Sequence, residues 1–551
     1  MKMAAFKTFI LLFAAALAGC QEAGTQAIDQ PNLPTKPNIL WLVAEDLSPI
    51  ISPFGDDTVA TPNLDRLAAE GVRYTRVFST SGVCAPSRAA IATGMYQNRI
   101  GAQHMRTTNV SGFGVEGLIA YEAVPPPYVK MHSQYFREAG YYTSNNAKED
   151  YQFRKAVTAW DESSNQAHWR NRASGQPFFS IFNFGITHES QVWAQAENPL
   201  RVPEDLEVPI PPYLPDTDIA RQDIRQVYSN IITMDEQVGR ILDELEADGL
   251  LESTVIFWYT DHGGPLPRQK RLLYDAGLQV PMIIRYPDGW RAGEIDEQLI
   301  SFVDFKSTAL SLAGMEPPDY VDGRAFAGEF QSSEERQYIH AAADRFDRQY
   351  DTIRAVRDAR FKYLRNYNPE QGYYLPLTYR EQMPIMQELL RLRDLGQLNE
   401  AQAQWFRQVK PEQELFDTES DPHELVNLAT DPAYAEKLSE LSAELDNWLS
   451  GFDDKGMMPE PDFIREIWPG MEQPVTRSPT ATQQYGRVVL ASTTEGANIG
   501  YQILAADEEL AGTWSVYTEP VPLAADQRLI AIAHRIGYKP SSMIELVGST
   551  L

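Results

Sequence analysis

Apolar residues between positions 37 and 335 form short continuous runs separated by amphipathic stretches. Continuous apolar runs of strand length are expected of strands that are buried on both faces of a sheet. Four segments have this pattern: residues 38–43, 178–184, 254–259 and 281–285. We predict that these segments are strands of one central sheet.

Two of the intervening stretches have the periodicity of helices. The first has Thr61 as a capping residue and Pro62 at the first helical position, and it ends at Gly71. In the second, residues 224–245, apolar positions recur every three or four residues and form one stripe. Strands that alternate with helices predict an α/β domain over residues 37–335, built on a large, mostly parallel sheet flanked by helices.

The pattern changes after residue 335. Short alternating runs at 338–340 and 361–364 predict a small antiparallel sheet, and charged or amphipathic stretches at 381–410 and 434–449 predict helices. We therefore expect a smaller C-terminal α+β subdomain over residues 336–475.

A Pro-rich break at residues 459–479 precedes the last segment of the chain. This segment alternates short apolar runs with Gly and Asp turns, which is typical of all-β modules. We predict an appended β-sandwich-like module over residues 480–551, with strands at 488–491, 499–503 and 529–533.

The first 20 residues have the pattern of a targeting segment. Lys2 and Lys7 precede a short apolar run that ends in Leu-Ala-Gly before Cys20, and this run is too short to span a bilayer. The segment resembles a bacterial lipoprotein signal peptide, in which Cys20 becomes acylated; an ordinary secretory signal is the alternative. We expect an exported, lipid-anchored protein at the bacterial outer membrane or cell surface, with the periplasmic face also open, and a flexible linker over residues 21–36.

Composition narrows the classes of function. Hydrophobic residues make up 43% of the chain and aromatic residues 11%, as in globular proteins. The formal net charge of -28 argues against a nucleic-acid partner, and a site for an anionic polymer would need local positive charge. The only cysteines are Cys20 and Cys84, so acylation of the first leaves one thiol and no internal disulfide. Cys84 is then either a buried apolar residue or a chemically active one.

Chemically active residue types follow two of the predicted strands. Glu45 and Asp46 come directly after the first strand, and Asp261 and His262 follow the strand at 254–259. Chemistry in such sheets collects beyond the carboxyl ends of the strands, and carboxylate oxygens are hard ligands that suit calcium. Cys84 begins a predicted helix four residues before an arginine, which predicts a lowered thiol pKa.

The segment Cys84-Ala85-Pro86-Ser87-Arg88, followed by Thr93-Gly94, resembles the signature of the type I, formylglycine-dependent sulfatases of the alkaline-phosphatase-like superfamily. The resemblance covers most of residues 37–430, and residues 263–271 are most similar to the sulfamidase-like, polysaccharide-sulfatase branch. Further matches follow in the family's order at residues 38–46, 61–67, 260–263 and 414–424.

The resemblance implies a mechanism. In this family a formylglycine-generating enzyme oxidises the cysteine to an aldehyde, and one hydroxyl of its hydrate takes the sulfuryl group while the other later expels sulfate. Cys84 would then be the modified nucleophile, and Arg88 would stabilise its ionised hydroxyl. Lys148 and Lys270 would bind the sulfate, and His188 would protonate the leaving oxygen.

The resemblance also implies a calcium ion held by Glu45, Asp46, Asp261, His262 and an oxygen of the modified Cys84. The chain departs from the family at three positions. Glu45 replaces an aspartate, and His262 replaces an asparagine, so that a softer imidazole stands in place of a carbonyl oxygen. Asp150 replaces a histidine that usually holds the formylglycine.

Four further residues are candidates for substrate contacts. His104 and Arg106 follow the nucleophile helix, with a packed loop as the alternative interpretation. Arg268 and Arg271 flank Lys270 and could supply positive charge for a sulfated sugar.

The expected substrate is a sulfated polysaccharide or its oligosaccharides, such as ulvan. Heparan-type and carrageenan-type substrates remain open, including an N-sulfoglucosamine sulfohydrolase activity. The alternative of the same class is a phosphoesterase of the same superfamily, and the alternative of a different class is a non-catalytic glycan-binding protein that keeps the fold.

Overall fold

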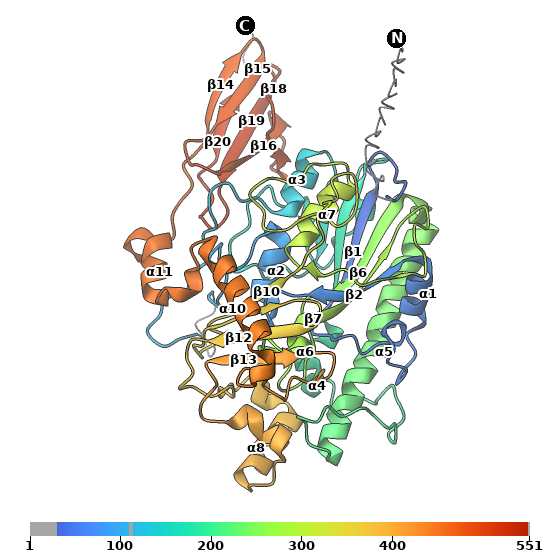
Figure 1. Ribbon diagram of the computed structural model, residues 1–551. Helices are drawn as coiled ribbons and strands as arrows, with labels where there is room; N and C mark the ends of the chain where they lie inside the picture. Colours follow the sequence, from blue (N-terminus) through green and yellow to red (C-terminus); the bar gives the residue numbers. More distant parts are fainter. Residues whose placement is uncertain (1–29, 109–113, 549–551) are drawn as a thin grey trace, which may run out of the picture.

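The computed structural model describes residues 30–108 and 114–548 (Figure 1). The predicted signal peptide, including Cys20, lies outside the described residues. Among the described residues, no helix has both the length and the apolar character that crossing a membrane requires.

A nine-stranded sheet forms the centre of the molecule. Its strands are β1 (Asn38–Ala44), β2 (Val72–Phe78), β3 (Tyr142–Asn146), β4 (Glu162–Ser163), β5 (Phe178–Phe184), β6 (Thr254–Thr260), β7 (Gln279–Arg285), β8 (Ile295–Asp296) and β9 (Ile300–Ser301). The order is β4-β3-β5-β1-β6-β7-β2-β8, and β9 also pairs with β2. Within the described strands of this sheet, only β7 runs antiparallel to its neighbours. The predicted mostly parallel sheet and its four predicted strands are confirmed.

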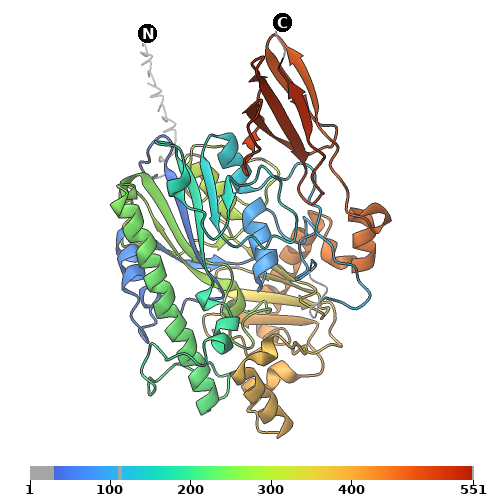
Figure 2. The same cartoon turned by 180° about the vertical axis from the view of Figure 1, so that it is seen from behind.

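Helices cover both faces of this sheet (Figures 1 and 2). One face carries α1 (Pro62–Glu70) and α5 (Asp218–Ala247), and the other carries α2 (Cys84–Thr93), α3 (His132–Glu138) and α7 (Asp304–Leu312). Leu40 and Leu42 of β1 pack in the first core, whereas Trp41 and Val43 pack in the second. A strand covered on both sides is apolar at every position, which explains the continuous run in the sequence.

Helix α1 begins as predicted at Pro62, but its cap differs from the prediction. The Thr61 side chain makes no capping hydrogen bond. The Asp235 carboxylate of α5 accepts hydrogen bonds from the backbone N–H groups of Asn63 and Leu64, at 3.2 and 2.9 Å. A charged group from a distant helix therefore replaces the local cap, and its negative charge also complements the helix dipole.

The C-terminal subdomain contains an antiparallel sheet of β10 (Ile339–Ala343), β11 (Ile353–Arg357), β12 (Phe361–Asn366) and β13 (Gln413–Asp417), with α10 (Ala435–Ser450) packed on it. The single helix predicted over residues 381–410 is wrong. This stretch forms α8 (Pro384–Asp394) and the short α9 (Glu400–Ala403). Gly396 has a φ of 65°, and the Asn399 side chain caps α9, so local turn chemistry ends one helix and starts the next.

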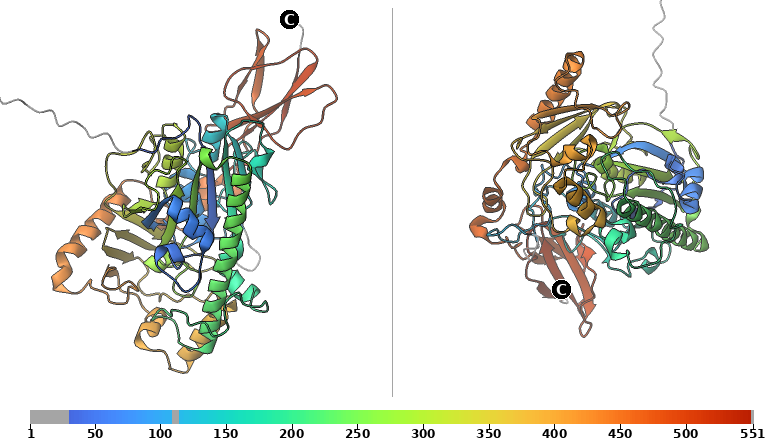
Figure 3. Two further views of the ribbon diagram at one scale, coloured as in Figure 1. Left: turned by 90° about the vertical axis from the view of Figure 1, so that its right-hand side faces the viewer. Right: turned by 90° about the horizontal axis from the view of Figure 1, so that it is seen from below.

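The last segment forms two small antiparallel sheets that share an apolar core. One contains β14 (Thr480–Gln484), β15 (Arg487–Ala491) and β18 (Val521–Pro522), and the other contains β16 (Asn498–Ala505), β17 (Ser515–Val516), β19 (Gln527–His534) and β20 (Ile544–Val547). This unit, here called the β module, projects from the body of the molecule (Figures 1 and 3).

The predicted Pro-rich break at residues 459–479, which connects to the β module, contains regular structure. Residues Glu460–Ile467 form helix α11, whose Phe463 and Ile464 side chains are fully buried. Pro459 and Pro461 fall at the cap and in the first turn, where a missing N–H costs the helix nothing.

Candidate active site

The carboxyl ends of β1, β5 and β6 bring the predicted acids together. Glu45 and Asp46 follow β1, and Asp261 and His262 follow the adjacent β6. The Asp46 backbone N–H donates to Asp261 Oδ1 at 3.1 Å, which ties the two strand ends to each other. Asp46, Asp261 and His262 are fully buried, so this is an internal polar centre at the edge of the sheet.

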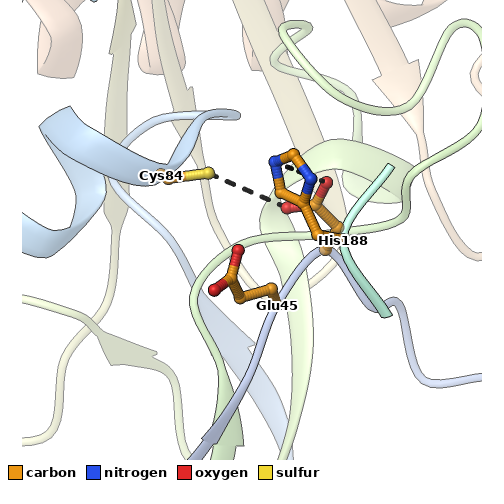
Figure 4. A group of neighbouring side chains, drawn as sticks. Glu45, Cys84 and His188 are labelled. Atoms are coloured by element: carbon orange, nitrogen blue, oxygen red, sulfur yellow. Dashed lines mark hydrogen bonds and ion pairs between the residues drawn. The ribbon is translucent and has the colours of Figure 1, made fainter. Parts of the chain in front are cut away.

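Cys84 is the first residue of α2 and faces this centre. Its Sγ lies 3.8 Å from Asp46 Oδ1 and 3.4 Å from His262 Nε2. Figure 4 shows Cys84, Glu45 and His188 pointing toward one another from three different elements. The thiol is only 1% exposed, yet it lies among charged groups, so its surroundings are not those of an ordinary apolar core cysteine.

Each of the three acids has its own cation. Lys148 Nζ lies 2.7 Å from Glu45 Oε2, and Lys270 Nζ lies 2.6 Å from Asp46 Oδ2. Arg88 Nε donates to Asp261 Oδ2 at 2.9 Å. Burial by itself would raise the pKa values of Asp46 and Asp261. The neighbouring positive charges together outweigh burial and lower both values, with Lys270 the strongest of these charges for Asp46 and Arg88 the strongest for Asp261.

The same cations act on the thiol. Burial alone would raise the pKa of Cys84, but the charges of Lys148 and Lys270 outweigh it and lower the pKa to about 7. The predicted lowering is therefore present, although its main cause is two lysines from distant segments of the chain. This positive charge also offers partners for a doubly charged anion at the start of α2.

The donor set fits a bound cation. Ligand atoms of Asp46, Cys84, Asp261 and His262 all lie within 4.8 Å of one another, and a second such group adds Glu45 and His188. Burial lowers the pKa of His262, but Asp46 and Asp261 raise it to about 10, so the ring carries a proton that must leave before its nitrogen can bind a metal. Ionised carboxylates and a neutral imidazole would together supply oxygen and nitrogen donors.

His188 follows the short turn after β5. Its Nε2 is 3.2 Å from Lys270 Nζ, and its Nδ1 is 2.8 Å from Ser190 Oγ. Burial and Lys270 lower the pKa of His188, but Asp46 and the Cys84 thiolate offset them and leave it above the ordinary value. His188 Nε2 therefore faces the centre of the site beside Lys270.

Two further charged residues, Glu189 and Arg271, lie beside Lys270. Glu189 accepts two hydrogen bonds from Arg271, at 2.9 and 2.7 Å, and lies 3.3 Å from Lys270 Nζ. Its own backbone N–H donates to Asp46 Oδ2 at 2.8 Å. Arg271 is therefore buried against Glu189 and does not lie on an open surface. Through Glu189 it holds Lys270 and the end of β1 in place.

Of the other residues predicted to bind substrate, only Arg106 lies near the rim of the site. Its guanidinium pairs with Asp347 and lies 4.8 Å from the centre of the Tyr379 ring. That ring also packs near His188 and Trp193, at centroid distances of 6.4 and 5.2 Å. An arginine with two aromatic rings beside the general-acid candidate is suited to a sugar.

His104 and Arg268 lie elsewhere. His104 is 4% exposed and its Nδ1 accepts from the Arg345 backbone N–H at 3.3 Å, as the packed-loop interpretation predicts. Arg268 donates to the carbonyl oxygens of His423 and Glu424, both at 2.9 Å, and is buried. Its guanidinium therefore joins two parts of the chain, and a role of Arg268 in substrate binding stays a prediction.

The sequence reasoning missed three residues of the site: Asn183, Glu189 and Tyr379. Asn183 Oδ1 accepts from Arg88 Nη1 at 2.7 Å and is a polar residue in the otherwise apolar β5, a signal that could have found it. Glu189 directly follows His188, which was a weaker signal. Asp150, in place of the family histidine, lies 3.9 Å from Lys148 Nζ and adds negative charge there.

Comparisons with known proteins agree with this geometry. The Sulfatase family model matches residues 37–174 and 161–315, and the model of the N-sulphoglucosamine sulphohydrolase C-terminal region matches residues 268–388. An ulvan-active sulfatase of Formosa agariphila is 53% identical over 94% of this chain and 92% of its own length. Human N-sulphoglucosamine sulphohydrolase is 26% identical over 75% of this chain and 89% of its own length.

Comparison with solved structures shows that the chain shares its fold with sulfatases. The solved structure of BT4656 in complex with its substrate, D-glucosamine-2-N,6-O-disulfate, superposes with a TM-score of 0.56 at 17% identity, over 77% of this chain and all of that one. At this identity the likeness concerns the fold alone, whereas the family model and the Formosa relative cover the site as well. The chain therefore belongs to the sulfatase family of the alkaline-phosphatase-like superfamily and is a sulfuric ester hydrolase.

Proposed function

We propose that this enzyme hydrolyses sulfate esters of ulvan or of ulvan oligosaccharides. The observation that carries the proposal is the geometry around Cys84, whose Sγ faces acids and lysines that are 38 or more residues away in the sequence. The 53% identity to an ulvan-active sulfatase supports the choice of polymer. The Arg106–Tyr379 pair at the rim is consistent with a sugar substrate.

The nucleophile in this proposal is formylglycine made from Cys84 by a formylglycine-generating enzyme. When hydrated, this group supplies an attacking hydroxyl and a second hydroxyl for release of sulfate. Ser87 donates to the Asp261 carbonyl, and Arg88 pairs with the Asp261 carboxylate, so α2 is held against β6. Both contacts fix the direction in which residue 84 points.

The remaining side chains divide the work. Lys148 and Lys270 neutralise the sulfate oxygens, because both ammonium groups lie close enough to Cys84 for their charges to lower its pKa. His188 gives its Nε2 proton to the leaving sugar oxygen, and Ser190 orients the ring through Nδ1. The leaving group then departs as an alcohol, so the lysines are not left facing an alkoxide.

We also propose that the bound cation is calcium. Glu45, Asp46 and Asp261 are hard donors, whereas His262 is the softer member of the set. The ion would supply positive charge for the sulfate and for residue 84. Removing metal with a chelator is expected to abolish activity and lower the Tm, and readded Ca²⁺ is expected to restore both. Recovery with Mn²⁺ but not with Ca²⁺ would contradict calcium as the native ion.

For location, we propose an exported lipoprotein anchored through Cys20 at the bacterial outer membrane or cell surface. The proposal is supported by the basic start, the short apolar run and the small residues before Cys20. Mass spectrometry of the mature N-terminus, with metabolic labelling by a palmitate analogue, tests it. A free N-terminus upstream or downstream of Cys20, without label, would contradict it.

The central test combines two measurements on enzyme coexpressed with a formylglycine-generating enzyme. Peptide mass spectrometry should show Cys84 converted to the aldehyde, and ion chromatography should show sulfate released from ulvan oligosaccharides. Release from N-sulfoglucosamine alone would favour the heparan-type alternative. The match of residues 268–388 to the N-sulphoglucosamine sulphohydrolase C-terminal model supports that alternative. Phosphate release with Cys84 dispensable would favour a phosphoesterase, and conversion without any turnover would favour a glycan binder.

A further inference from the structure

The end of β19 and the turn that follows it rest on the loop that carries Lys148. This loop, residues 147–161, connects β3 to β4 and contains no helix or strand. The turn, residues 534–538, belongs to the β module, more than 370 residues later in the sequence. Figures 1 and 2 show the β module against the body of the molecule on the side of α3.

His534 makes the most specific contact of this junction. Its Nε2 lies 2.9 Å from the Tyr538 carbonyl oxygen, and its Nδ1 lies 3.1 Å from the Val157 backbone nitrogen. A carbonyl oxygen can only accept, so Nε2 carries the hydrogen and Nδ1 of the neutral ring accepts from Val157. Burial lowers the pKa of His534, in agreement with a neutral ring. The Gly537 N–H adds a bond to the Arg154 carbonyl at 2.8 Å.

Packing reinforces these hydrogen bonds. Ile536 is 3% exposed and belongs to the core of the catalytic domain, together with Phe153 and Trp160 of the loop. Gly537 has a φ of 81°, and a Cβ there would lie 2.4 Å from the Ala123 carbonyl oxygen. The turn therefore approaches the catalytic domain as closely as its backbone allows.

The loop transmits this contact to the site. Tyr151 stacks on Phe153 at a centroid distance of 5.6 Å and lines a small cavity together with Lys148 and Arg88. Lys148 Nζ, three residues before Tyr151, reaches Glu45 at 2.7 Å. Ile536 and Phe153 thus share one core, Phe153 stacks on Tyr151, and Tyr151 lines the same cavity as the lysine.

We propose that the β module positions Lys148, with His534 and Ile536 as positioning residues that fix the 147–161 loop. The proposal rests on the proposed function, in which Lys148 binds the sulfate. An irregular loop does not by itself hold a lysine against one carboxylate, and an ammonium displaced by about 1 Å loses much of its effect on the reacting atoms. The β module is in this view part of the catalytic machinery and not only an appendage.

A double-mutant cycle tests the coupling. His534→Ala should lower kcat on sulfated oligosaccharide about tenfold, because the loop loses its acceptor for Val157. His534→Asn should recover most of this loss, since its amide oxygen can accept in place of Nδ1. In a Lys148→Met background, His534→Ala should change kcat by less than about twofold. A full tenfold loss in that background would overturn the proposal.

Hydrogen–deuterium exchange supplies a readout that is independent of turnover. Residues 147–161 should exchange faster in His534→Ala than in the parent protein, whereas the peptide that contains β6 should not change. Val488→Ala is the matched control, because Val488 is fully buried in the core of the β module and does not contact the loop. Equal exchange of the loop in His534→Ala and in the parent would overturn the proposal.

The two outcomes separate this proposal from the proposed function. If the loop loses protection in His534→Ala but no variant releases sulfate, including the parent, then the β module does hold the loop in place and the assigned reaction is wrong. If instead the parent is active and Lys148→Met lowers its activity, but the exchange of the loop is the same in His534→Ala, then the assigned reaction holds and the positioning role of the β module is wrong.

Discussion

Two of the buried charge clusters in the described part of the chain look alike in composition and differ in use. The active-site cluster contains Glu45, Asp46, Asp261, Arg88, Lys148 and Lys270. The interface cluster contains Asp275 of α6 (Asp275–Leu278) with Arg357, Lys362 and Glu424 of the C-terminal subdomain. In the interface cluster Lys362 Nζ contacts Asp275 and lies 2.8 Å from Glu424, and Arg357 lies 2.5 Å from Asp275.

The two clusters differ in the state of some of their acids. The pKa values of Asp46 and Asp261 are lowered, as is that of Asp275 in the interface cluster, whereas burial raises the pKa of Glu424 and raises that of the neighbouring Glu414 to about 8. Glu424 shares its partner Lys362 with Asp275, and the charge of Asp275 raises the pKa of Glu424 further.

The difference shows what marks a functional cluster. Interface side chains point at one another and at backbone groups, such as the Leu273 carbonyl 3.0 Å from Lys362 Nζ. Active-site donors point at one shared volume beside Cys84, with ligand atoms within 4.8 Å of one another. Burial and charge are common to both clusters, so it is the convergence of the donors that distinguishes the site.

The largest expected effect separates chemistry from folding. Cys84→Ala should lower sulfate release by at least about 10³-fold, because it removes the precursor of the nucleophile. The Tm should change by only a few degrees, since alanine fits the first position of α2 and the lost Sγ makes few apolar contacts. Sulfate release and calorimetry on the same preparation measure both. Retained turnover would exclude Cys84 as the nucleophile.

The second prediction concerns the interface cluster. Lys362→Met should lower the free energy of unfolding by about 3–5 kcal/mol, because Asp275 and Glu424 lose a buried partner. Below the melting transition, kcat/KM should stay within about twofold of the parent value, since no interface side chain faces Cys84. Urea unfolding followed by fluorescence, alongside sulfate-release kinetics, checks this expectation. A large loss of kcat in the folded variant would show that the two clusters are coupled.

The same substitution in the active-site cluster should give the opposite result. Lys148→Met should lower kcat/KM about 10²-fold, because a charge aimed at the sulfate is removed, with a smaller loss of stability than Lys362→Met. Lys148 is partly exposed at 23% of its side-chain surface, so water can reach the Glu45 carboxylate that it leaves. A stability loss equal to that of Lys362→Met would contradict the distinction between the clusters.

The smallest effect is a pH dependence of stability at Glu414. Burial raises the pKa of this carboxyl to about 8 from an ordinary value near 4.5, so the folded state binds more protons than the unfolded state between these limits. Stability should therefore fall as the pH rises, by about 2 kcal/mol between pH 5 and 7 from this group alone. Glu414→Gln should flatten the profile in this window and keep the acceptor for the Tyr373 hydroxyl. A parent profile that rises from pH 5 to 7 and is unchanged by the variant would refute it.

Several parts of the molecule follow from local sequence alone. The apolar runs predicted four strands of the central sheet, because a strand covered on both faces must be apolar at each position. The position of the acids after β1 and β6 predicted that they meet, since parallel strands end at one edge. The segment from Cys84 to Arg88 identified the family before any geometry was known.

Arg268 and Arg271 show where this reasoning stops. Both flank Lys270 with the same residue type, yet one donates to the His423 and Glu424 carbonyls and the other to Glu189. Each has a positive φ, and nothing in the local sequence distinguishes their directions. Their directions depend on segments that lie more than 80 residues away, so only tertiary packing separates them.

The sequence by itself determined four strands of the central sheet, the strand ends that carry the acids, and the cysteine that the family modifies, because these depend on neighbours within a few residues. Only the tertiary structure decided which cation meets which acid, that Asp235 caps α1, and that a turn of the β module rests on the loop of Lys148. Such contacts join residues that are up to 377 positions apart, and their energies depend on distance in space and not on distance along the chain.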